Sequence, residues 1–185
     1  MTTYFTIGVI SLIFLTIISL YNNLVRKKNE TENAFGSVDA MLKKRYDLIP
    51  NLVETVKKYM VHEAGLLQEI TNIRSGLTKD IPDDKKVEIH NDLTSKLNNV
   101  ILQVENYPDL KASRNFLNLQ GALNDVEEQI SAARRFYNDA VTKYNNAVQV
   151  FPSNIIASVS GFHRKEVLVI DEIERKNVDI KKLFN

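Results

Sequence analysis

Few residues of this sequence have the types and spacing that enzyme chemistry needs. His62-Glu63 matches the start of the His-Glu-x-x-His pattern of zinc peptidases, but Leu66 stands where the second histidine would be. Carboxylate-bridged di-iron bundles need Glu-x-x-His pairs, and none of the three histidines has Glu three residues before it. The chain also lacks Cys, a Gly-x-Ser-x-Gly elbow and a Gly-rich phosphate loop. We therefore expect no catalytic residues, no metal site and no cofactor, and predict that the protein is not an enzyme.

Two tyrosine-asparagine pairs are the clearest polar candidates on an apolar face. Tyr137-Asn138 and Tyr144-Asn145 repeat at a seven-residue interval, so each Tyr points into a helix seam and each Asn lies at its edge. We interpret the rings as core packing, with their hydroxyls satisfied at the rim. The alternative is a ligand-binding pocket between helices, lined by these two tyrosines and Tyr59.

Two further groups could be functional. His62 lies in register with an apolar face, and we interpret it as a hydrogen-bonded core histidine rather than a ligand or a pH sensor. Lys43, Lys44 and Arg45 could contact phospholipid head groups, but they lie ~27 Å beyond the apolar amino terminus along a continuous helix. A solvated face, or local pairing with Asp47, is the preferred interpretation.

The elements that must position these residues begin with an uncharged amino terminus. All 24 Lys and Arg and all 23 Asp and Glu residues follow Val25, and their near balance argues against a nucleic-acid-binding protein. Residues 4–25 are long enough, at about 1.5 Å per residue, to cross a hydrocarbon layer of about 30 Å. We predict that residues 1–25 form a transmembrane anchor that contacts the lipid bilayer through residues 4–25.

The alternatives to an anchor are a cleaved secretory signal and a buried core helix. A signal needs a basic beginning and small residues at its cleavage site, and neither is present. Arg26, Lys27 and Lys28 follow the apolar run directly. The positive-inside rule then predicts an outside amino terminus and a cytoplasmic domain.

Residues 26–162 predict one helical domain with four long helices. Pro50 disfavours a helical conformation at Ile49, so we expect the first helix to end before it and a second helix to begin there. In the fourth helix the apolar residues recur at a mean spacing of about 3.5, the heptad value of near-parallel helix packing. Residues 155–162 are expected to fold back over one end of the bundle. The predicted helices run from Tyr4 to about Tyr46, from Pro50 to about Leu77, from about Asp84 to Glu105 and from Phe116 to Phe151.

Residues 163–185 form a predicted carboxyl-terminal tail. Its apolar run Val167–Ile170 is the only strand-like segment of the soluble part, and predicts one short strand or an extended segment. We regard this run as a candidate partner-docking element. Ile173–Asn185 is charged and expected to be loosely ordered.

Several runs of residues are also shared with a known family. They are Tyr21-Asn22-Asn23-Leu24-Val25, Asn33-Ala34-Phe35, residues 42–53 (LKKRYDLIPNLV), His62-Glu63, residues 107–112 (YPDLKA), Asn115-Phe116, Leu119-Gln120, Ala133-Arg134, Tyr137-Asn138, Tyr144-Asn145 and residues 151–154 (FPSN). From about Tyr21 to Phe162 the chain closely resembles the LemA family of bacterial membrane-anchored proteins. Phe35 departs from a usual Trp and Ala122 from a usual Glu, and the tail after Phe162 matches poorly.

The resemblance implies an all-α fold in which one transmembrane helix continues into an antiparallel, up-and-down four-helix bundle. It also implies an outside amino terminus, a cytoplasmic bundle and no enzyme activity. We therefore expect a non-enzymatic, single-pass protein of the bacterial inner membrane that acts as a scaffold or accessory protein. Its partner would be another membrane-associated protein or a second copy. The alternatives are a ligand- or lipid-binding module and a hydrolase-associated regulator of envelope quality control.

Overall fold

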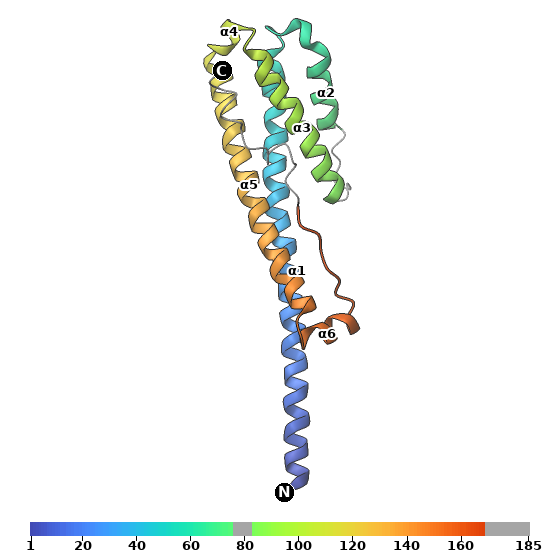
Figure 1. The fold of residues 1–185 in the computed structure, drawn as a ribbon. Helices are drawn as coiled ribbons and strands as arrows, with labels where there is room; N and C mark the ends of the chain where they lie inside the picture. Colours follow the sequence, from blue (N-terminus) through green and yellow to red (C-terminus); the bar gives the residue numbers. More distant parts are fainter. Residues whose placement is uncertain (76–82, 169–185) are drawn as a thin grey trace, which may run out of the picture. The chain divides into compact units, whose positions relative to one another are not determined.

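The computed structural model describes residues 1–75 and 83–168, and these residues form helices joined by turns and one extended segment (Figure 1). The all-α fold with four long helices is as predicted. Leu77, Val169, Ile170 and Ile173–Asn185, about which the sequence made predictions, lie outside the described residues. The long helices are α1 (Thr2–Val56), α2 (Ala64–Ser75), α3 (Asp83–Val104) and α5 (Arg114–Gln149). The short ones are η1 (Val61–Glu63), α4 (Pro108–Lys111) and α6 (Ser153–Val159).

Helix α1 is longer than expected, because the predicted break at Pro50 is absent. The helix passes through Pro50 and ends at Val56. An internal proline costs about 3 kcal/mol, partly because it removes one backbone hydrogen bond. Ile49, Leu52 and Val56 are at most 1% exposed, and burial of each stabilises the fold by about 1.5–3 kcal/mol. Packing of this last part of α1 therefore outweighs the local cost, and the second long helix begins only at Ala64.

Contacts divide the chain into two compact units, which are described separately. The first unit comprises Met1–Met41 and Gln129–Val167, and the second contains Leu42–Glu128. Both α1 and α5 contribute to each unit.

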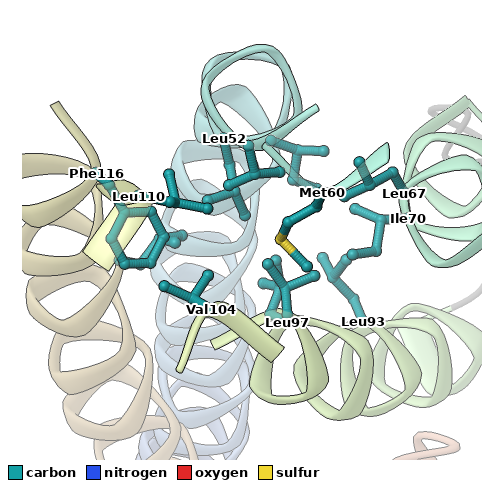
Figure 2. Packing of buried hydrophobic residues seen from close by; sticks show 13 residues of the cluster. Leu52, Met60, Leu67, Ile70, Leu93, Leu97, Val104, Leu110 and Phe116 are labelled. Carbon is teal, nitrogen blue, oxygen red and sulfur yellow. The ribbon is translucent and has the colours of Figure 1, made fainter. Parts of the chain in front are cut away.

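The second unit contains a hydrophobic core enclosed by the end of α1, by α2, α3 and α4, and by the beginning of α5. Figure 2 shows Met60 of the turn after α1 lying between residues of α2 and α3. Met60 is fully buried, since the chain turns back on itself directly after α1. The core residues are Ile49, Leu52, Val56, Met60, Leu67, Ile70, Leu93, Leu97, Val100, Val104, Leu110, Phe116 and Leu123.

The first unit is built on the paired α1 and α5. On α1 the buried residues of this unit are Leu24, Thr31, Ala34 and Val38. On α5 they are Ile130, Arg134, Tyr137, Ala140, Val141 and Tyr144. Most of these α5 residues occupy or adjoin the apolar positions that recur about every 3.5 residues, which we call the heptad stripe. The predicted stripe is confirmed except at Phe151, which follows the end of α5 and has an exposed ring.

Helix α6 lies where the sequence predicts a fold-back segment. It ends at Val159 and is followed by Gly161, which has a φ of 71°, a conformation that glycine adopts without strain. The amide of Phe162 donates to the carbonyl of Ala157 at 2.9 Å, as in a Schellman cap. This cap turns the chain into the extended segment 162–168. Residues 162–168 contain no strand, and the rest of the predicted run, Val169 and Ile170, lies outside the described residues.

The amino-terminal part of α1 is apolar and bare. Among the described residues α1 is the one helix long and apolar enough to cross a membrane, and 0% of its most apolar window is buried in the protein. The residues before Leu20 are all exposed, including Phe5, Leu12 and Phe14. Nothing in residues 1–75 and 83–168 covers this surface.

Candidate docking site: the tail clamp

The two tyrosines selected from the sequence lie together on α5. Their seven-residue spacing equals two helical turns, which places both rings on one side of the helix. Tyr137 is 9% exposed and Tyr144 is 2% exposed, whereas Asn138 and Asn145 are half-buried at the edge. The prediction of buried rings with asparagines at the rim is confirmed.

The partners of these side chains are in the tail. The Tyr144 hydroxyl donates to the carbonyl of His163 at 2.9 Å, and the Tyr137 hydroxyl donates to that of Glu166 at 3.4 Å. Asn145 makes two bonds with Lys165: its Nδ2 donates to the carbonyl at 2.8 Å, and its Oδ1 accepts from the amide at 2.9 Å. We call Tyr137, Tyr144 and Asn145 the tail clamp.

In these four hydrogen bonds the tail contributes main-chain groups only. Asn145 offers Lys165 one donor and one acceptor, which is what a neighbouring strand would offer an extended residue. Three side chains of one helix thereby satisfy four main-chain groups of a segment that pairs with no strand in the described part of the chain. These bonds hold the tail extended without depending on the side chains of residues 163–166.

The side chain of Lys165 adds a contact to α1. Its ammonium donates to Thr31 Oγ1 at 2.9 Å and lies 3.7 Å from the Glu32 carboxylate. Thr31 is fully buried, and its own hydroxyl donates to the carbonyl of Lys28 at 2.7 Å. Lys165 therefore links α1 to a segment whose main chain is held by α5.

Two pairs of aromatic rings also connect α1 with α5 and with the segment that follows α6. The rings of Phe35 and Tyr137 pack edge to face, with centroids 5.6 Å apart and planes at 68°. Phe35, where the family usually has Trp, therefore packs its ring against α5. Near α6, Tyr21 and Phe162 pack in the same manner at 5.9 Å and 69°.

The environment of Tyr144 keeps its hydroxyl protonated. Burial raises the pKa of the phenol above its usual value of 10.0, and the Glu32 carboxylate raises the pKa further. Both effects disfavour the phenolate. The Tyr144 hydroxyl therefore remains a donor to the tail at and above ordinary pH.

A second polar cluster lies in the second unit, around Arg45. Its guanidinium Nη1 lies 2.7 Å from Glu127 Oε2 of α5 and donates to Thr94 Oγ1 of α3 at 2.9 Å. His90 Nε2 lies 3.5 Å from the same nitrogen. Arg45 is 5% exposed, so the prediction of a solvated residue or a pair with Asp47 is wrong. One guanidinium thus connects three helices.

The hollow beside this cluster is small. Its volume is about 130 Å³, whereas ligand pockets hold about 300 to 1,000 Å³. It is lined by Arg45, Thr94, Leu97, Asn98, Ile101, Leu123, Asn124 and Glu127.

The other predicted site residues are not part of either cluster. His62 is exposed, because it belongs to the short η1 turn, which has no buried residue; the prediction of a core histidine there is wrong. Tyr59 is 42% exposed and lines a depression of the second unit, whereas Tyr137 and Tyr144 belong to the first. In residues 1–75 and 83–168 no three His, Asp or Glu residues are grouped as metal ligands would be.

Three residues of these clusters, Thr31, His90 and Lys165, were missed from the sequence, and a fourth, Arg45, was interpreted as solvated. Thr31 and Arg45 continue the seven-residue series of buried positions at 24, 38 and 52 on α1, so register predicts their burial. His90 lies three residues before Leu93 on the buried face of α3 and is 2% exposed. Lys165 gives no such signal, because its partners come from the distant Thr31 and Asn145.

Comparison with known proteins agrees with the architecture. Residues 34–181 match the LemA family, so the likeness extends past Phe162, where the resemblance had been taken to end. Protein LemA of Metamycoplasma hominis is 30% identical over 182 residues, which cover 98% of this chain and 83% of that protein. Magnetosome protein MamQ 2 of Paramagnetospirillum magneticum is 22% identical over 177 residues, or 82% of this chain and 65% of the relative. Magnetosome protein MamQ of Magnetospirillum gryphiswaldense is 22% identical over 188 residues, or 86% and 69%. The chain belongs to the LemA family.

Proposed function

We propose that this chain is a non-enzymatic, single-pass membrane protein whose helical domain is a scaffold. The domain docks another membrane-associated protein or a second copy of the chain. The observation that carries the proposal is α1: one helix of 55 residues joins a bare apolar segment to both helical units. An anchor built in this way holds the domain at the membrane without a flexible linker.

The polar chemistry of the described residues supports a structural role. Tyr137, Tyr144 and Asn145 are engaged with main chain of the tail, and Arg45 is engaged with groups of neighbouring helices. These contacts hold the fold together, and the hollow that Arg45 lines has a volume of about 130 Å³. Of the relatives, one is named Protein LemA, and the MamQ proteins are named for the magnetosome.

The charge pattern supports a cytoplasmic domain at the bacterial inner membrane. Arg26, Lys27 and Lys28 follow the apolar run, and no basic side chain precedes it. A reporter enzyme that is active only after export tests this orientation. Fused to the carboxyl terminus it should be inactive, and fused before Thr2 it should be active; the reverse pattern would refute the orientation.

Docking can be tested from exposed apolar residues of the domain. Phe136 is 59% exposed and Leu117 is 51% exposed on α5. A photoreactive phenylalanine at either position of the full-length chain in native membranes should give a discrete covalent adduct with a membrane protein or a second copy. The matched control is the same probe at the exposed Asn146. Recovery of monomer alone from both apolar positions would contradict the scaffold proposal.

A further inference from the structure

A second stretch of the chain is uncharged, in addition to the amino-terminal run. Residues 144–162 contain no Lys, Arg, Asp or Glu and include the end of α5 and all of α6. Contiguous exposed apolar side chains mark a surface that contacts something other than water. In this stretch they are Val150, Phe151, Ile155 and Val159, which are 58%, 75%, 53% and 86% exposed.

Helix α6 buries Ser153 and Ala157, whereas its large apolar residues are half-buried, at Ile156, or turned outward, at Ile155 and Val159. Ser153 and Ala157 are 7% and 1% exposed, and Ile155 and Val159 lie on the opposite side of the helix. A helix that packs on a domain in water has the reverse arrangement, with its large apolar residues buried. The outer face of α6 therefore suits an apolar environment.

The position of α6 along α1 is fixed by the ring contact between Tyr21 and Phe162, at 5.9 Å. Figure 1 shows α6 beside α1. The first charged residue after Tyr21 is Arg26, and the first after Phe162 is Arg164. Both segments thus become basic just beyond the ring pair, and Tyr rings followed by basic residues are typical of the boundary between lipid and water.

We infer that α6, together with Phe151, lies in the interfacial layer of the membrane that α1 crosses. Ile155 and Val159 insert at the boundary between head groups and acyl chains, as in other interfacial helices. The inference rests on the proposed function, because it needs α1 in a bilayer. Lipid is the partner that fits this patch, because the patch carries no charge. The Tyr21–Phe162 pair also joins the patch to the exposed apolar surface of α1.

The chain has no Cys, so single-cysteine variants carry a fluorophore at one chosen position. We would label Ile155→Cys and Val159→Cys in the full-length protein reconstituted in phosphatidylcholine vesicles. Quenching by iodide reports exposure to water, and quenching by nitroxide on the lipid acyl chains reports insertion. Leu12→Cys is the control for the anchor. Ser37→Cys is the control for water, because Ser37 is exposed on the same helix, ~24 Å from Tyr21.

If α6 is interfacial, iodide quenching at residues 155 and 159 should be at least about threefold weaker than at residue 37, with nitroxide quenching correspondingly stronger. Iodide quenching equal to that at residue 37, together with a lipid-quenched label at residue 12, would overturn the inference and leave the anchor standing. A label at residue 12 that iodide reaches would overturn both proposals. Asn146→Cys tests whether shielding is confined to the apolar patch: equal shielding there would contradict insertion of α6 itself.

Discussion

Replacing Asn145 with Ala should release the tail locally while leaving the helices intact. The change removes both hydrogen bonds to Lys165, at 2.8 and 2.9 Å, and leaves the tyrosines of the tail clamp in place. Each bond contributes about 0.5–1.5 kcal/mol net, so the free energy of local opening should fall by about 1–3 kcal/mol. Since 1.4 kcal/mol is a factor of ten, opening should become about 5- to 150-fold more frequent.

Hydrogen exchange at the Lys165 amide measures this opening directly, because that amide is the donor to Asn145. Asn145→Asp is a graded variant, since a carboxylate can accept from the amide but cannot donate to the carbonyl. Asn146→Ala is the matched control: it makes the same exchange of side chains at the next, exposed position of α5. Unchanged exchange at Lys165 in Asn145→Ala, or equal acceleration in the control, would refute the role of the tail clamp.

Three further predictions concern stability of the full-length chain in detergent, measured by denaturant unfolding. Arg45→Met should lower the free energy of unfolding by about 2–3 kcal/mol, because it removes the partner 2.7 Å from the Glu127 carboxylate, while Lys43→Met at an exposed position should change it by less than about 0.5 kcal/mol. An equal effect of the two would contradict a structural role of the buried guanidinium. Pro50→Ala should raise the free energy of unfolding by about 1–3 kcal/mol, because it restores an interior helical amide; destabilisation would show that the proline is required. Burial raises the pKa of Tyr144 in the folded state above 10.0, so its contribution is complete below about pH 10 and is lost as pH rises through the raised value. The stability advantage of the wild type over Tyr144→Phe should therefore be constant from pH 7 to about 9.5 and shrink above it, and an advantage independent of pH would refute this.

Periodicity predicted the helices well wherever it continued over many turns. The heptad stripe of α5 predicted both the length of the helix and the burial of Tyr137 and Tyr144. The break at Pro50 was wrong because the rule for proline is local, whereas the burial of Ile49 and Leu52 depends on helices that arrive later in the chain. Tertiary packing outweighed the local preference there.

The polar clusters were predicted less well, and register explains part of the difference. Thr31 and Arg45 share the seven-residue series of Leu24 and Val38, yet Thr31 was not selected and Arg45 was interpreted as a solvated residue. A prediction from position in the seven-residue series, rather than from residue type, would have placed both side chains in the buried face of α1. His62 shows the opposite error, since its apparent register continued a helix that had already ended.

Only one part of the tail clamp, the burial of its two tyrosine rings, could be predicted from the sequence. The sequence indicated that the hydroxyls of Tyr137 and Tyr144 would be satisfied at the rim of the seam. Their acceptors are main-chain carbonyls of residues 163 and 166, and main chain leaves no signature in residue types. The contacts that hold the tail on α5 therefore emerged only from the structure.

The unbroken course of α1 couples two motions that a flexible linker would separate. A helix turns by about 100° per residue, so the apolar run and the position of Thr31 have a fixed rotational phase. With the run held in a bilayer, as proposed, torsion of the anchor about its own axis swings Thr31, and the ammonium of Lys165 is bound to that hydroxyl at 2.9 Å. A rotation of the anchor within the membrane would therefore move the carboxyl-terminal tail through the side chain of Lys165.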